Sequence, residues 1–291
     1  MKMNDRHSFE YSEINKNKYL IIDSMKDNGF VNFKSVFSKD FISSFKNQVA
    51  EEIQKKGKRL MLGKSIMGAT NIIPGTEKFI LNSKLLEILD ILFDGKDYAF
   101  TSHSDLHLDL ISGWHKDSGE SVGGYFEGDY FNDDECKVYK IAVYLDDTDS
   151  NDCFSVRPKS HRYPYLTSFD EIQLPTNIGD IVIFDVRLDH RGRLPSPFEK
   201  FLKNMNLIFN FGNRNKQDFL LISHIAKFFR DFFKTKKRAS FFFTYGVLNK
   251  YTRDFSKANI ERQNKQLEGM PLSNSAITKE AFLEKRVKII D

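Results

Sequence analysis

Apolar positions in the middle of the chain follow the two-residue alternation, or the short unbroken runs, that are typical of β-strands. Clusters of Gly, Asp, Asn and Pro separate these runs, and the clearest of them occupy residues 98–107, 137–145, 154–157, 181–185 and 206–211. No helical pattern lies between them, which favours an antiparallel double-sheet barrel or jelly roll, the architecture that includes the cupins. We therefore predict a mainly β fold, a cupin-like double-stranded β-helix with helical additions.

Helices are predicted before these strands. Ser38 is a suitable N-cap for a first helix, because apolar residues follow it at the four-residue spacing of one buried face. That face consists of Phe41, Phe45 and Val49. Residues 84–93 predict a second, apolar helix, whereas residues 19–23 and 29–36 look like short segments that lead to a first strand. The polar, basic stretch 54–71 predicts a loop over a pocket.

Beyond residue 212 the pattern becomes helical, Phe-rich and basic. The expected apolar face consists of Phe219, Leu220, Ile222, Ile225, Phe228, Phe229, Phe232 and Phe233, and Lys234, Lys236, Lys237 and Arg238 follow it. We accordingly divide the chain into a barrel domain with N-terminal helices, residues 1–212, and a helical extension that packs on the barrel, residues 213–291. The extension also suits a lid, a dimer surface, or contact with a lipid-like molecule or a membrane surface, and these alternatives stay open.

Composition excludes several classes of protein. The net charge of +4 over 291 residues is small and gives no reason to expect nucleic-acid binding. Cys136 and Cys153 lack C-x-x-C spacing and are expected to be reduced thiols. The polar N-terminus has no apolar signal core, and no apolar stretch is long enough for a membrane span. These features predict a cytoplasmic protein, and they leave the oligomeric state open.

Candidate chemistry centres on His115-Lys116-Asp117 and on His190, which lies 75 residues after His115. In a strand, residues i and i+2 point to one face, so His115 and Asp117 can bind one ion while Lys116 points away. A second imidazole from His190 completes two nitrogens and one carboxylate on one side of the ion, the ligand set of non-heme Fe(II) enzymes. An H-x-D triplet also arises by chance, with its histidine in a purely structural role.

Four segments resemble the phytanoyl-CoA dioxygenase family of Fe(II)- and 2-oxoglutarate-dependent oxygenases. They are residues 29–38, 113–118, 139–161 and 179–192, and they occur in the family's order over roughly residues 29–212. The resemblance implies that His115, Asp117 and His190 hold Fe(II), with 2-oxoglutarate as cosubstrate and dioxygen as oxidant. It also implies that His103, His107 and His161 are not ligands.

The resemblance further requires a cation for the distal carboxylate of 2-oxoglutarate. The family normally uses an arginine shortly after the distal histidine, at the start of the next strand. Lys200 and Lys203 occupy that place here, and Arg193 comes sooner after His190. We expect Lys203 to bind the carboxylate, because it is nearer the strand predicted at 206–211; the alternative is that both lysines face water. The predicted pocket wall consists of Trp114, Tyr125, Phe126, Tyr139 and Tyr144.

The function that follows is hydroxylation of an unactivated C–H bond in a small metabolite. An intact Asp117 favours hydroxylation over halogenation, because related halogenases have a small residue there. Basic residues at 55–59 and in the tail favour an anionic substrate. Two alternatives remain: a cupin-like metalloenzyme that does not use 2-oxoglutarate, and a non-catalytic binding protein on the same barrel.

Overall fold

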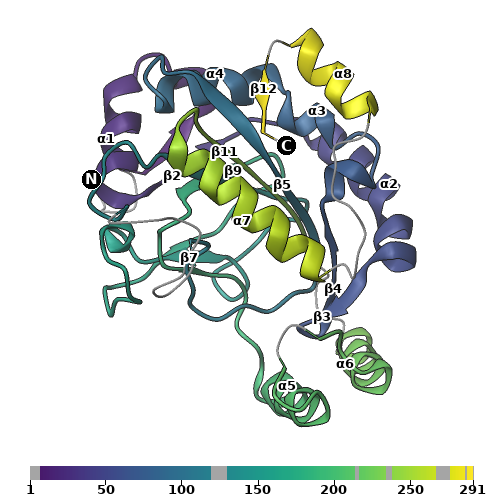
Figure 1. The fold of residues 1–291 in the computed structure, drawn as a ribbon. Helices are drawn as coiled ribbons and strands as arrows, with labels where there is room; N and C mark the ends of the chain where they lie inside the picture. Colours follow the sequence, from purple (N-terminus) through teal and green to yellow (C-terminus); the bar gives the residue numbers. More distant parts are fainter. Residues whose placement is uncertain are drawn as a thin grey trace.

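A computed structural model describes residues 7–118, 130–213, 216–233, 238–266, 276–285 and 287–290. Within these residues two β-sheets form the centre of the molecule and helices flank them (Figure 1). The larger sheet has nine strands. They are β1 (Ser8–Glu10), β2 (Phe30–Lys34), β3 (Lys58–Leu60), β4 (Gly63–Met67), β5 (Tyr98–Leu108), β6 (Val138–Tyr144), β9 (Ile181–Asp185), β11 (Ala239–Val247) and β12 (Lys288–Ile289).

The larger sheet runs in the order β1-β2-β9-β6-β11-β5-β4-β3, and β12 also pairs with β5. Its central strands are antiparallel: Phe241 of β11 lies opposite Leu106 of β5 on one side and Val143 of β6 on the other. The four strands predicted at 98–107, 137–145, 154–157 and 181–185 are present as β5, β6, β7 (Phe154–Val156) and β9.

The smaller sheet has three strands in the order β10-β7-β8, where β10 is His190–Arg191 and β8 is Ile172–Leu174. The segment that carries His115 adds to its edge through an antiparallel bridge to His190. Apolar side chains of both sheets meet in one buried cluster, which includes Phe154 from β7 and Phe184 from β9. The two sheets therefore pack face to face.

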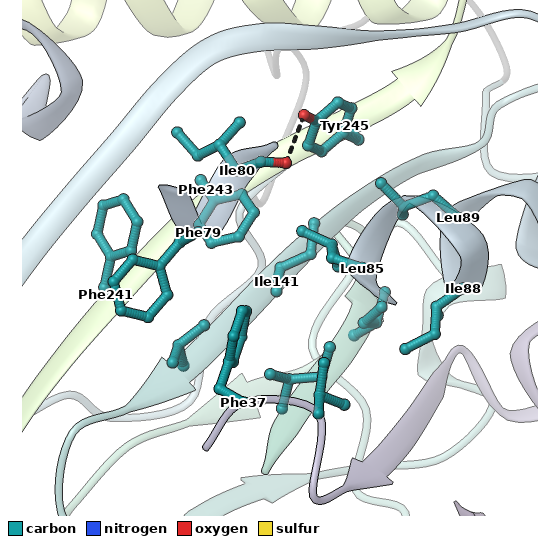
Figure 2. Packing of buried hydrophobic residues seen from close by; sticks show 14 of the residues in the cluster. Phe37, Phe79, Ile80, Leu85, Ile88, Leu89, Ile141, Phe241, Phe243 and Tyr245 are labelled. Atoms are coloured by element: carbon teal, nitrogen blue, oxygen red, sulfur yellow. Dashed lines mark hydrogen bonds between the residues drawn. The ribbon is translucent and has the colours of Figure 1, made fainter. Parts of the chain in front are cut away.

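Helices cover the outer face of the larger sheet. They are α1 (Lys18–Asn28), α2 (Lys39–Lys56), α3 (Glu77–Ile80) and α4 (Ser83–Leu92). Figure 2 shows the core between them and the sheet, where Phe79 lies against Phe241 and the hydroxyl of Tyr245 donates to the carbonyl of Ile80 over 2.9 Å. Ser38 caps α2 as predicted, accepting a hydrogen bond from the amide of Phe41.

One further helix, α7 (Lys250–Gln266), lies across β5 and β11 on the opposite face of this sheet (Figure 1). It is attached by polar contacts to β5: Ser256 donates to the carbonyl of Thr101 over 2.8 Å, and Gln263 donates to Asp105 over 2.9 Å. The inner face of the sheet is thus partly covered by a segment from late in the chain.

Two predicted segments have a different structure. Residues 206–211 were expected to form a strand, but most of them belong to helix α5 (Pro197–Phe209). Ser196 and Glu199 form a capping box at its start and Pro197 occupies the first turn, so local signals for a helix outweigh the apolar run. Residues 19–23, expected to lead to a strand, lie within helix α1.

The tail is not wholly helical. It contains α6 (Leu220–Phe232), α7 and α8 (Ala276–Glu284), but residues 239–247 form the central strand β11. Phe241, Phe243 and Tyr245 alternate into the core, which is the pattern of a strand buried in a sheet. The predicted loop at 54–71 is also wrong: β3 and β4 form a hairpin there, with Met61 and Leu62 both at positive φ in its two-residue turn.

Candidate metal centre

His115, Asp117 and His190 lie together at the edge of the smaller sheet. One ligand atom from each falls within 4.8 Å of the others, and no other group of His, Cys, Asp or Glu in the described part of the chain is arranged this way. Asp117 Oδ1 is 3.9 Å from His115 Nε2, and Asp117 Oδ2 is 3.5 Å from His190 Nε2. The bridge that joins the two histidines, with two backbone hydrogen bonds of 3.0 Å, holds their side chains on one face.

The Nδ1 atom of each imidazole is hydrogen-bonded to a backbone carbonyl. His115 Nδ1 lies 2.8 Å from the carbonyl of Gly113, and His190 Nδ1 lies 3.0 Å from the carbonyl of Leu188. A carbonyl only accepts, so each Nδ1 carries a proton and Nε2 is the ring atom left to bind an ion. The ring of His190 is also fixed by Phe154 and Phe184, whose centroids lie 5.4 Å and 4.7 Å from it.

The charges around the centre favour an ionised carboxylate and a neutral imidazole. Burial lowers the pKa of His190 to about 3, with the neighbouring His115 acting in the same direction, so His190 is neutral at physiological pH. Burial by itself would raise the pKa of Asp117, but the Lys140 ammonium outweighs burial and holds that pKa well below its usual range. Lys140, on β6, places its Nζ 3.0 Å from Asp117 Oδ2.

Lys116 points away from the centre, as the strand argument predicts. Its buried Nζ lies 2.6 Å from Asp189 Oδ1 and donates to the carbonyls of Ser160 and Arg187, each over 2.7 Å. A fully paired buried cation of this kind fixes the backbone between His115 and Asp117. The residue between the two candidate ligands therefore anchors them.

A cavity of about 860 Å³ opens in front of the three side chains. Trp114 and Tyr144 line it, and the guanidinium of Arg157 covers the Trp114 ring at 4.1 Å. Tyr139, which was also predicted for the pocket wall, instead stacks on Phe93 in the main core, so that prediction is wrong. Its position on β6 is one residue from Lys140, and the alternation of the strand sends it to the other face. Tyr125 and Phe126 lie outside the described residues.

The cations predicted for 2-oxoglutarate are differently placed. Lys200 and Lys203 border the cavity, but from helix α5. Arg193 does not line this cavity; it forms a two-pronged pair with Glu199, both distances being 2.8 Å. The next strand after His190 in either sheet is β11, and the residue directly before it is Arg238.

Arg238 lines the same cavity and is 9 % exposed. Its guanidinium lies 4.6 Å over the Tyr144 ring and donates to the carbonyl of Asp152. Its backbone amide donates to Asp109 Oδ1 over 2.9 Å, which fixes the start of β11. Helices α5 and α6 separate it from His190 in the sequence, so spacing alone missed it; the alternating aromatic run at 241–245 was the available signal.

Three other histidines have partners of their own. His103 contacts Asp105 and Thr244 at 3.1 Å and 2.7 Å, and His107 contacts Ser65 at 2.9 Å. The Nε2 of His161 lies 3.1 Å from the carbonyl of Lys26. Of the residues in these contacts, His107 and Asp105 line the cavity and add polar groups to its inner wall.

No protein-family model and no curated protein matches this chain. Solved structures do match in fold. The non-heme alpha ketoglutarate dependent carbocyclase SnoK from nogalamycin biosynthesis is 13% identical with a TM-score of 0.52, over 79% of this chain and 87% of that one. The epimerase SnoN in complex with Fe3+, alpha ketoglutarate and nogalamycin RO is 10% identical with a TM-score of 0.53, over 80% and 84%.

A third match is HygX from Streptomyces hygroscopicus with nickel and 2-oxoglutarate bound, at 14% identity and a TM-score of 0.51, over 77% of this chain and 84% of that one. At these identities the likeness is one of fold. The chain therefore shares its fold with non-heme iron enzymes that depend on 2-oxoglutarate.

Proposed function

We propose that this protein is an Fe(II)- and 2-oxoglutarate-dependent dioxygenase. The observation that carries the proposal is the donor set at the cavity: the Nε2 atoms of His115 and His190 and the carboxylate of Asp117, within 4.8 Å of one another. Two imidazole nitrogens and one carboxylate on one face suit Fe(II) and leave the opposite positions open. The fold shared with 2-oxoglutarate-dependent enzymes supports this choice of metal and cosubstrate.

We infer that the two sheets are those of a double-stranded β-helix of the phytanoyl-CoA dioxygenase type. The central strands of the larger sheet run β5-β11-β6-β9, and the smaller sheet runs from the His115 segment through β10 and β7 to β8. From β5 to β11, consecutive strands thus alternate between two facing sheets, except that β7 and β8 pair with each other within the smaller sheet, and this order is that of a jelly roll. The resemblance of residues 29–38, 113–118, 139–161 and 179–192 to that family supports the same assignment.

Arg238 is the better candidate than Lys203 for the distal carboxylate of 2-oxoglutarate. The family resemblance places this cation at the start of the strand after the distal histidine, and that strand is β11. A guanidinium grips a carboxylate with two parallel hydrogen bonds, which an ammonium does not. The alternative metalloenzyme without 2-oxoglutarate was suggested by a missing arginine, and Arg238 removes that reason.

The residues of this chain would position the reactants and protect them from water. Bound iron would supply the activation of dioxygen for attack on a substrate C–H bond. Lys140 keeps Asp117 ionised, the carbonyls of Gly113 and Leu188 orient the two imidazoles, and Trp114 and Tyr144 wall the cavity. Lys200 and Lys203 then remain available for a small, anionic substrate that enters past α5.

The test is release of succinate from 2-oxoglutarate by iron-loaded protein on exposure to air. We expect slow turnover by the wild type, none by Asp117→Ala, and wild-type turnover by Asp27→Ala, which removes an exposed carboxylate that does not line the cavity. Protein that binds iron but neither binds nor decarboxylates 2-oxoglutarate would refute the proposal.

A further inference from the structure

Helices α5 and α6 pack against each other and project from the body of the protein (Figure 1). Their outer surfaces carry large apolar side chains in contact with solvent. The exposed fractions are 57% for Phe201, 68% for Ile208, 63% for Phe228 and 68% for Phe232. An exposed apolar surface of this kind on a globular protein marks an interaction site more often than chance.

These side chains form a stripe on each helix. At 100° per residue, Leu221, Phe228 and Phe232 fall within one narrow sector of α6, and Phe201 and Ile208 do the same on α5. The stripes are joined across the pair, because the rings of Phe198 and Phe229 lie 4.2 Å apart. We call this joined surface the hairpin patch.

Other side chains of α5 and α6 pack against the body of the protein, and these contacts keep the hairpin patch on the outside. The inner faces of the two helices supply Leu202, Ile222 and Ala226 to a buried cluster with Leu62 and Ile111. Each helix already buries another face, so the exposed phenylalanines are not needed to pack the pair against the body of the protein.

Buried polar groups fasten the pair to the body. Asp218, two residues before α6, accepts from the amide of Leu62 over 2.6 Å and from Asn206 of α5 over 2.7 Å. Arg230 of α6 donates to the carbonyl of Asp109 over 3.2 Å and also to that of Leu62. Both helices thus present their apolar stripes from a fixed position.

The charge of the segment that contains α5 and α6 indicates which kind of partner the hairpin patch would bind. Residues 197–233 contain six Lys and Arg against three Asp and Glu. Of the acidic residues, Glu199 and Asp218 are buried and paired. Lys216 and Lys227 are exposed, and the sequence adds Lys234, Lys236 and Lys237 directly afterwards. An isologous dimer through this surface would bring the lysines of both copies together, whereas an anionic lipid surface would attract them.

We propose that the hairpin patch binds the surface of an anionic membrane. Aromatic and aliphatic side chains beside lysines are the composition of helices that lie in the lipid interface, with the apolar face in the acyl boundary and the lysines at the phosphates. Each helix has 13 residues, too few to cross a bilayer, and no helix in the described part of the chain is long and apolar enough for that. Because α5 also borders the candidate cavity, this orientation sets the cavity beside the membrane.

The experiment is flotation of the full-length protein with vesicles of phosphatidylcholine alone and of phosphatidylcholine mixed with phosphatidylglycerol, without metal. We expect binding to the anionic vesicles that weakens as salt is added. Phe228→Ser/Phe232→Ser should lower the partition coefficient at least about tenfold. Lys216→Glu/Lys227→Glu should lower it about fivefold or more per lysine. Tyr19→Ser/Leu20→Ser, which removes exposed apolar side chains from α1, should not change it.

The four substituted hairpin residues are exposed, so the variants should keep the wild-type circular dichroism spectrum and melting temperature. Absence of binding to either vesicle at low salt would overturn the proposal. So would a concentration-dependent dimer that Phe228→Ser/Phe232→Ser dissociates, because a second copy would then cover the patch. The assay needs neither iron nor turnover, so its outcome is independent of the proposed dioxygenase activity.

Discussion

Replacing Arg238 tests how the protein would hold 2-oxoglutarate. Arg238→Gln removes a buried guanidinium and, if Arg238 binds 2-oxoglutarate as proposed, would leave the distal carboxylate of the cosubstrate without a cation. Loss of one partner of a buried charged pair costs about 2 to 5 kcal/mol, so affinity for 2-oxoglutarate should fall at least about 30-fold. Arg238→Lys keeps the charge but loses one of two parallel hydrogen bonds, worth about 1.5 kcal/mol, so a loss of roughly tenfold is expected.

Affinity would be measured by calorimetry on the Mn²⁺-loaded protein without oxygen, and as the KM for 2-oxoglutarate in succinate release. Lys203→Ala and Lys200→Ala serve as matched controls and should change affinity less than twofold. Arg238 also contacts Tyr144 and the Asp152 carbonyl, so the melting temperature of each variant shows whether the fold is intact. The reasoning fails if folded Arg238→Gln binds 2-oxoglutarate normally while Lys203→Ala does not.

Three further predictions concern the candidate metal ligand His190 and the ion pairs made by Lys140 and Glu199. His190→Ala should lower Mn²⁺ affinity more than about 100-fold, because replacing a residue that merely hydrogen-bonds to a metal ligand can already lower affinity by up to that factor. Unchanged affinity in calorimetry would remove His190 from the ligand set. Lys140→Met should destabilise the metal-free protein by about 3 to 5 kcal/mol in urea unfolding, because Asp117 is left as an uncompensated buried charge. Added Mn²⁺ should recover most of that loss, and an equal loss with and without metal would contradict the pairing seen here. Burial alone would raise the pKa of Glu199, but hydrogen bonds from Arg193 and the Ser196 amide lower it from 4.5 to about 2, which corresponds to about 3 kcal/mol. A depressed carboxyl pKa stabilises the fold above pH 4.5, and this stabilisation is lost as the pH falls toward 2. The difference in free energy of unfolding between wild type and Glu199→Gln should therefore close over that range. A difference that does not change with pH would show that it does not come from the charge of Glu199.

Secondary structure was predicted best from the sequence where apolar residues follow a single local pattern. The strands at β5, β6, β7 and β9 are short apolar runs bounded by turn residues, and they were predicted at nearly their observed positions. His115, Asp117 and His190 were singled out from strand geometry and family resemblance, and the structure places their ligand atoms within 4.8 Å. Their binding of iron stays a prediction.

The errors came from contacts that a local pattern does not record. The run at 206–211 is apolar enough for a strand, but the capping box at Ser196 starts a helix that continues into it. Lys140 was missed because its role depends on Asp117, which is distant in the sequence. Arg238 was missed because two helices, α5 and α6, lie between it and His190, so the start of the next strand is far along the sequence from that histidine.

The position of β11 has a consequence for how the chain folds. Ser240 pairs with His107 on one side and with Tyr144 on the other, so the strand at the centre of the larger sheet is synthesised long after both of its neighbours. Until residues 239–247 leave the ribosome, β5 and β6 each present an unpaired edge of apolar residues. Such edges template aggregation, and pairing over long sequence separation is slow. We therefore expect nascent chains that end before residue 239 to depend on chaperones, and closure of the sheet to be a late, cooperative step in which the candidate metal centre and its cavity are completed together.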